Sequence, residues 1–178
     1  FNEKKITALF TPLEEQLPTL IQRVIDKQSK ASPRSLTGPF SQHDQISLGH
    51  DVMKLLGFDF NHGRLDTAHH PFCGGSPEDV RITTRCHDSD FLSSLMAVCH
   101  ETGHGIYEQN LPLNWLTQPV GKAMGMAWHE SQSLLVEMQI CRSKPFINLI
   151  YPLLQKYWSK DCITTADNLF ALATHVKP

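Results

Sequence analysis

The pentapeptide His100-Glu101-Thr102-Gly103-His104 has the residue types and the spacing best suited to chemistry in this chain. Histidines four residues apart lie one above the other on a helix, so both imidazoles can reach one tetrahedral metal ion. Glu101 projects beside them toward the position of a water molecule, where a carboxylate can act as a general base. The pattern therefore predicts a helix that carries a metal site.

A five-residue pattern also arises by chance, and a site of this kind needs a third protein ligand. The third histidine of metzincins would fall at position 110, which is Asn110, so that class is excluded. A carboxylate on a second helix remains, and the candidates are Glu130 and Glu137. Because these two are seven residues apart and share a helical face, periodicity does not choose between them.

The elements that must position these residues are mostly helical. Apolar residues recur at helical spacing over residues 4–28, 43–56, 89–109, 119–143, 146–157 and 164–174. Asp88 or Ser89 is the expected cap of the helix that carries the motif, and Asn110 its end. Gly103 and Gly105 each weaken a helix by about 1 kcal/mol relative to alanine, so we expect a close approach of backbone or ligand there.

The first helical pattern contains two prolines. Pro12 could instead lie in the first turn of a shorter helix capped by Thr11. Residues 29–42 are rich in Ser, Pro and Gly and are expected to form a loop.

Residues 63–68 and 79–85 alternate as β-strands do, on either side of a turn-like segment at residues 73–77. One side of the second strand is apolar, and the other carries Arg81 and Arg85. The fold class that follows is mainly α, a helical core that carries the H-E-x-x-H motif, with a small antiparallel β element.

Composition excludes several functional classes. The chain has 16 Lys plus Arg against 18 Asp plus Glu and no basic block, so nucleic acid is not an expected partner. No apolar stretch approaches the roughly 18 residues of a membrane helix. The 5 cysteines include no C-x-x-C pair, which suits neither a disulfide framework nor a zinc knuckle. We therefore expect reduced, buried thiols and a cytoplasmic location.

Both ends of the sequence look cut. It begins at Phe1 without an initiator Met and stops at Pro178 directly after a helical pattern. We expect residues 1–178 to form one partial catalytic domain, truncated at both ends.

Four motifs in order resemble the Taq-type, M32 family of metallocarboxypeptidases. They are His70-Pro71-Phe72, the stretch 79–85 (DVRITTR), the motif at 100–104 and His129-Glu130-Ser131-Gln132. The resemblance implies a largely helical enzyme that depends on zinc or cobalt, is usually a homodimer, and releases C-terminal residues from peptides. It assigns the metal ligands to His100, His104 and Glu130 and the catalytic carboxylate to Glu101. Glu137 then becomes a residue of the helix face or one that supports a ligand.

The sequence also departs from the family pattern. Members are considerably longer, and the later motifs I-R-x-x-A-D and G-x-x-Q-D-x-H-W do not occur before Pro178. Cys86 stands where Tyr is expected, and Leu134 and Val136 stand where Arg and Trp are usual. These departures bear on substrate preference more than on metal binding.

A carboxypeptidase must also recognise a free C-terminal carboxylate, which suits the planar fork of arginine. Arg81 and Arg85 are the candidates, with a structural ion pair to Asp79 as the alternative, and His70 could line the cleft or belong to a loop. For two further residues the alternatives also stay open. His129 is expected to support a ligand or to pack, and Tyr107 to donate to an oxyanion or to pack.

The predicted function is that of a metal-dependent carboxypeptidase acting on peptides with a free C-terminus. Two alternatives remain: a catalytically inactive metal-binding fragment, and an endopeptidase of the same H-E-x-x-H plus Glu type.

Overall fold

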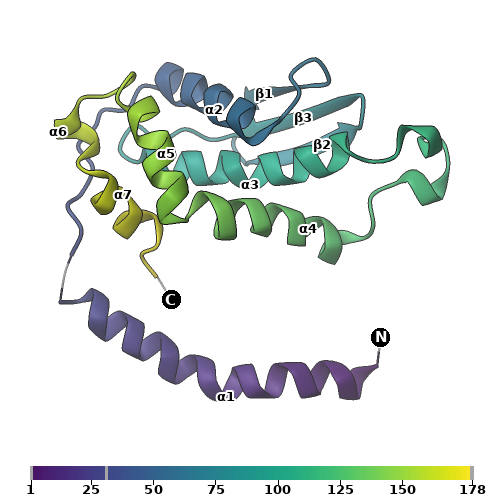
Figure 1. Ribbon diagram of the computed structural model, residues 1–178, viewed down its shortest axis with the longest axis horizontal. Coiled ribbons are helices and arrows are strands. Elements are labelled where there is room, and N and C mark those ends of the chain that lie inside the picture. Colours follow the sequence, from purple (N-terminus) through teal and green to yellow (C-terminus); the bar gives the residue numbers. More distant parts are fainter. Residues whose placement is uncertain (1, 31, 177–178) are drawn as a thin grey trace.

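The computed structural model describes residues 2–30 and 32–176. Most of this part is helical, which confirms the mainly α class (Figure 1). The α-helices are α1 (Glu3–Gln28), α2 (Gln42–Leu56), α3 (Phe91–Gln109), α4 (Met126–Leu134), α5 (Lys144–Leu154), α6 (Lys160–Ile163) and α7 (Ala166–Ala173). The strands are β1 (Gly63–Thr67), β2 (Phe72–Ser76) and β3 (Asp79–Thr84). Two 3₁₀ turns, η1 (Leu113–Trp115) and η2 (Pro119–Gly121), precede α4, and the π-helical segment η3 (Leu135–Cys141) continues it.

Helix α3, which carries the pentapeptide, lies at the centre of the packed part of the molecule. It packs against α2, against β2 and β3, and against α4 and η3 (Figure 1). Leu95 and Cys99 belong to an apolar cluster shared with α5 and α7, whereas Val98 belongs to a second cluster shared with the sheet. Because a helix buried on several sides has little freedom to rotate or shift, this core fixes the direction of the polar side chains on α3.

The small sheet is mixed rather than antiparallel. Its strand order is β1-β3-β2, with β1 parallel to β3 and β2 antiparallel to β3. The segment predicted as a turn at residues 73–77 is largely strand β2, and the reversal falls at Pro77 and Glu78. Glycines favour a turn in the sequence pattern, but Gly75 pairs with Val80 in the ladder at a φ of +126°, a value that favours glycine.

One face of β3 packs on α3, as its alternation predicts. Val80 and Ile82 are fully buried, while Arg81 on the other face is exposed. Gly105 of α3 lies against this apolar layer, because a Cβ built on it would stand 2.8 Å from the Phe58 ring and 2.9 Å from Cδ1 of Ile82. The close neighbours of this glycine are therefore side chains rather than the backbone or ligand expected from the sequence.

Several predicted helix boundaries are wrong. The cap of α3 is Asp90, whose Oδ1 accepts a hydrogen bond from the backbone N–H of Ser93 at 3.1 Å, and neither Asp88 nor Ser89 caps the helix. The helix predicted over 119–143 begins only at Met126, since the chain before it forms the turns η1 and η2. Gly121 lies in these turns, where a Cβ would collide with the carbonyl of Trp115.

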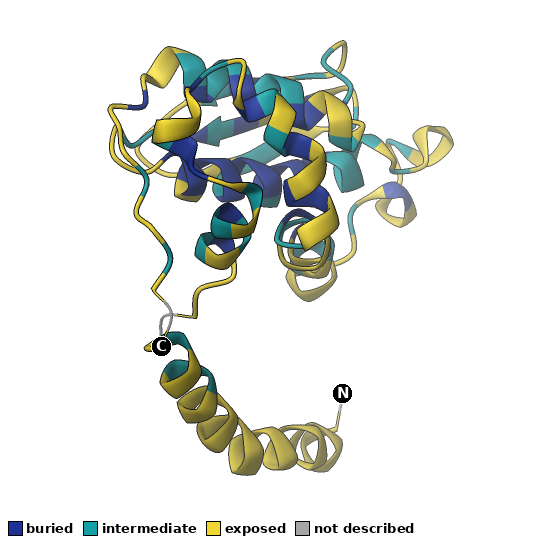
Figure 2. Cartoon of the chain, turned by 60° about the vertical axis from the view of Figure 1, so that its left-hand side comes forward, coloured by how far each residue is buried: buried dark blue, intermediate teal, exposed yellow. Residues whose placement is uncertain are grey.

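Helix α1 lies apart from the other elements. It runs without interruption through Pro12 and Pro18, so the alternative start at Thr11 is wrong; the Thr11 hydroxyl instead donates to the carbonyl of Thr7. None of its residues is buried (Figure 2), and most of its apolar residues, including Leu9 and Phe10, are exposed. Among the described residues, no helix has both the length and the apolar character needed to cross a membrane.

The packing at Gly105 predicts that Gly105→Ala destabilises the protein. Helix propensity alone would stabilise this variant by about 1 kcal/mol. Overpacking against Phe58 and Ile82 opposes that gain and costs typically about 1–3 kcal/mol. We expect urea denaturation to show a net loss of unfolding free energy.

Gly49→Ala on α2 is the matched control, because its Cβ would meet a side-chain methyl of Leu65 at 3.0 Å and two methyls of Val98 at the ordinary contact distance of 3.7 Å. Its loss should be smaller than that of Gly105→Ala. A Gly105→Ala protein more stable than the native protein would contradict the packing argument.

Candidate metal centre

Three side chains converge where α3 meets α4. Nε2 of His104 lies 3.3 Å from Oε2 of Glu130, and Nε2 of His100 lies 3.7 Å from the same oxygen. One possible ligand atom of each residue lies within 4.8 Å of the others. Across residues 2–30 and 32–176, no other group of three His, Cys, Asp or Glu side chains is close enough to share an ion.

Close contact between the two helices makes this convergence possible. A Cβ built on Gly103 would lie 2.7 Å from Cα of Ser133 and 2.9 Å from the carbonyl oxygen of Gln132, both backbone atoms of α4. Only a residue without a side chain leaves room for that approach. The close approach predicted at Gly103 is therefore confirmed, and it brings Glu130, one turn before Ser133, within reach of the histidines.

The far side of the His100 ring is held by a carboxylate. Nδ1 of His100 lies 3.0 Å from Oε2 of Glu137. Oε1 of Glu137 accepts two hydrogen bonds from the Arg142 guanidinium, at 2.7 and 3.1 Å. Glu137 therefore supports His100 from behind, while Nε2 of the same ring faces Glu130.

The far side of the His104 ring is held by a second imidazole. Nδ1 of His104 lies 2.6 Å from Nδ1 of His129, and Nε2 of His129 lies 2.8 Å from Oε1 of Glu108. His129 thus contacts a predicted ligand without facing Glu130 itself. Glu108, which sequence analysis missed, follows His104 by four residues on α3, and that helical spacing was the available signal.

Glu101 is buried, with 8% of its surface exposed. Burial raises the pKa of its carboxyl group, since removal from water disfavours the charged form, and the nearby His100 opposes this shift. Within the described ranges its carboxylate forms no hydrogen bond. A carboxylate with a raised pKa beside a candidate metal site is suited to accept a proton from water near neutral pH.

The donor set fits a catalytic zinc ion. Two imidazole nitrogens and one carboxylate oxygen face a common point, which is a ligand combination found in zinc hydrolases that keep a fourth position open. Burial also lowers the pKa of His104, and so does the nearby His129, which favours the neutral imidazole that a metal requires. A hydrogen-bonding partner behind each ring is typical of histidine ligands.

Strand β2 passes close to this centre. Burial, together with the nearby carboxylates of Glu101 and Glu108, raises the pKa of the Cys73 thiol to about 12. All five cysteines are free thiols, as predicted, but only Cys99 and Cys141 are fully buried.

The predicted substrate-binding residues lie on or beside the sheet. Arg81 forms an ion pair with Asp79 at 2.9 Å, and more than half of each side chain is exposed. Arg85 is exposed just after β3, and His70 is exposed in the loop before β2, where its carbonyl accepts a hydrogen bond from the Thr83 hydroxyl. Within the described chain, no side chain of the three forms a hydrogen bond or ion pair with the candidate ligands, and their role in substrate binding stays a prediction.

Tyr107 has a structural role in this conformation. Its hydroxyl accepts a hydrogen bond from the backbone N–H of Met124 at 3.0 Å, and its ring packs edge-on against His129 at 5.1 Å. It thereby joins the end of α3 to the segment that leads into α4.

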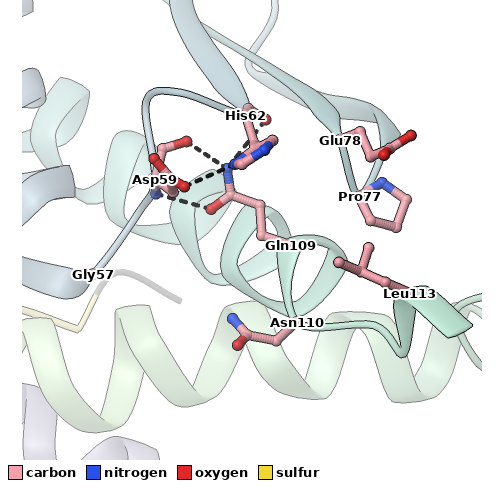
Figure 3. A pocket seen from close by; sticks show the side chains of 8 residues that line it. All are labelled: Gly57, Asp59, His62, Pro77, Glu78, Gln109, Asn110 and Leu113. Atoms are coloured by element: carbon pink, nitrogen blue, oxygen red, sulfur yellow. Dashed lines mark hydrogen bonds and ion pairs between the residues drawn. The ribbon is translucent and has the colours of Figure 1, made fainter.

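A pocket of about 340 Å³ opens at the C-terminal end of α3, lined by none of the candidate ligands (Figure 3). The amide of Gln109 crosses it, donating to the carbonyls of Asp59 and His62 and accepting from the backbone N–H of Asp59. These bonds tie the loop after α2 to the end of α3, so the polar lining of this pocket has a structural purpose.

The contact at Gly103 predicts that Gly103→Ala weakens metal binding. The added Cβ must displace the α4 backbone, which carries Glu130 away from the two imidazoles. We expect the affinity for Zn²⁺ to fall about 10- to 100-fold, the range seen when groups that orient ligands are lost. Competition with a chromogenic chelator measures this affinity.

Gly105→Ala serves as the control, because its Cβ strains the sheet side of α3 and leaves the α4 side unchanged. It should lose less affinity than Gly103→Ala. Equal affinity of the Gly103→Ala and native proteins would show that the helix contact does not set the position of Glu130.

A family model and related sequences both match this chain to carboxypeptidases. A family model described as the carboxypeptidase Taq (M32) metallopeptidases matches residues 1–178. Carboxypeptidase 1 of Bacillus subtilis is 36% identical over 156 residues, which cover 86% of this chain and 31% of that protein. Thermostable carboxypeptidase 1 of Thermus thermophilus is 33% identical over 150 residues, which cover 84% of this chain and 29% of that protein.

A solved structure shares the fold. The structure of metallocarboxypeptidase 1 of Trypanosoma cruzi matches 100% of this chain and 36% of its own, with a TM-score of 0.93 and 40% identity. The chain therefore spans about a third of the length of the relatives it matches. Together with the family match over residues 1–178, these similarities show that the chain belongs to the M32, or carboxypeptidase Taq, family of metallopeptidases.

Proposed function

We propose that the protein containing this chain is a metal-dependent carboxypeptidase that releases C-terminal amino acids from peptides. The observation that carries the proposal is the convergence of His100, His104 and Glu130 beside the buried carboxyl group of Glu101. Relatives that are named carboxypeptidases support the type of reaction. Zinc is the proposed cofactor, with cobalt as an alternative that the same donor set accepts.

Two imidazoles and a carboxylate would hold the ion and leave one position open. When bound, a divalent ion such as Zn²⁺ supplies a Lewis acid for the scissile carbonyl oxygen and makes water more acidic. Glu101 would take a proton from the attacking water as the water oxygen bonds to the carbonyl carbon. The same carboxyl group would then give that proton to the leaving amine as the C–N bond breaks.

Recognition of the substrate's C-terminal carboxylate is proposed for Arg81 and Arg85, with His70 lining the cleft. The guanidinium of Arg81 is already engaged by Asp79, so a substrate carboxylate would have to compete with that ion pair. Arg85 is exposed at the end of the same strand. Peptides are the proposed partners, and a cytoplasmic homodimer is the proposed state of the whole protein.

The proposed role of Glu101 predicts that Glu101→Gln keeps the metal and loses activity. The amide has nearly the shape of the carboxylate but cannot accept the proton, so kcat should fall by about 10²–10⁴-fold, the contribution typical of general acid–base catalysis. The assay follows amino-acid release from a peptide with a free C-terminus, using the full-length protein, and metal analysis accompanies it.

A peptide with an amidated C-terminus provides the matched control. A carboxypeptidase releases little from it, whereas an endopeptidase would still cut it and would replace the proposal. A native protein that holds zinc and cleaves neither peptide would favour a metal-binding module without catalysis. Undiminished activity of Glu101→Gln would refute the assigned role of that residue.

A further inference from the structure

The support behind His104 differs in kind from that behind His100. A carboxylate faces Nδ1 of His100, whereas a second imidazole faces Nδ1 of His104 at 2.6 Å. A carboxylate can only accept a hydrogen bond, but an imidazole nitrogen either donates or accepts. Two lone pairs at that distance would repel each other, so one of the two nitrogens carries a proton.

Glu108 favours one of these two arrangements. Its Oε1 lies 2.8 Å from Nε2 of His129, a hydrogen-bond distance at which this nitrogen must donate to the carboxylate. When Nε2 carries the only ring proton of His129, its Nδ1 presents a lone pair. His104 must then donate from Nδ1, which leaves the lone pair of its Nε2 directed at Glu130.

The same residues are also held in place by packing. His104, Tyr107 and Glu108 share one face of α3 at spacings of three and four residues. The His129 ring lies against the rings of His104, at 4.6 Å, and Tyr107, at 5.1 Å. The side chains of His129 and Glu108 are 16% and 18% exposed, so water has limited access to compete for their hydrogen bond.

We propose that Glu108 and His129 are positioning residues that fix His104 in the tautomer and orientation a metal ion requires. In this arrangement Glu108 orients His129, and His129 orients His104, although neither residue faces the centre of the site. The proposal rests on the proposed metal centre and adds to it the pair that prepares one of its ligands.

The test measures Zn²⁺ affinity of the full-length protein by chelator competition. His129→Leu removes the acceptor for His104, and Glu108→Ala removes the group that orients His129. Each should weaken binding about 10- to 100-fold. His129→Asn places an amide oxygen near the former Nδ1 and should stay within about fivefold of the native affinity, less than the loss expected when such a partner is removed.

A spectroscopic readout accompanies the affinities. The visible absorption bands of the Co²⁺-substituted protein report ligand geometry, and they should change in His129→Leu and return toward the native spectrum in His129→Asn. His43→Leu, at an exposed histidine of α2, is the control and should match the native protein in both measurements. Thermal unfolding of each metal-free variant identifies any that fail to fold.

The outcomes separate this proposal from the proposed function. Native protein that binds no Zn²⁺ would refute the metal centre, and the positioning proposal with it. Native protein that binds Zn²⁺ while a folded His129→Leu variant binds equally well would overturn the positioning proposal alone. Equal losses in folded His129→Leu and His129→Asn variants would overturn it too, because they would indicate a packing role.

Discussion

Backbone contact between α3 and α4 at Gly103 is the constraint on which the rest of the candidate metal centre depends. The two histidines come from α3, and the carboxylate that faces them comes from α4. Glu130 reaches both Nε2 atoms only because no side chain separates the helices one turn further along. A glycine that weakens the helix locally thus serves the assembly of the site, since its cost of about 1 kcal/mol is offset where the helices pack.

The apolar core holds the contact between α3 and α4 in place. Helix α3 contributes to both apolar clusters, so the sheet on one side and α5 and α7 on the other limit its movement. Behind the imidazoles, Glu137 and His129 limit rotation of the rings. Fixed ligands reduce the reorganisation that metal binding would otherwise require, which is the general advantage of a preformed site.

Much of the site could be predicted from residue spacing. Helical periodicity placed His100 beside His104, and it correctly put Glu130 and Glu137 on one face of the next helix. It could not separate these two, because both face α3: Glu130 lies toward Nε2 of His100, and Glu137 lies toward Nδ1 of the same ring. Resemblance to a family implies Glu130 as the ligand; its Oε2 lies near Nε2 of both histidines, and the assignment stays a prediction.

The features that spacing did not predict depend on contacts between distant segments. The glycines of β2 predict a turn because glycine is common in turns, yet the edge pairing of β2 with β3 accommodates Gly75. The start of α4 depends on turns whose close packing at Gly121 is not visible in local propensity. The partnership of Glu108 with His129 joins residues on two helices and requires their relative placement.

The most direct test of whether His100, His104 and Glu130 hold the ion is anomalous diffraction at the zinc absorption edge. It uses a crystal of the zinc-loaded full-length protein. We expect one peak bonded to Nε2 of His100, Nε2 of His104 and a carboxylate oxygen of Glu130. A zinc peak held by other residues, with Glu130 turned away from both imidazoles, would contradict it.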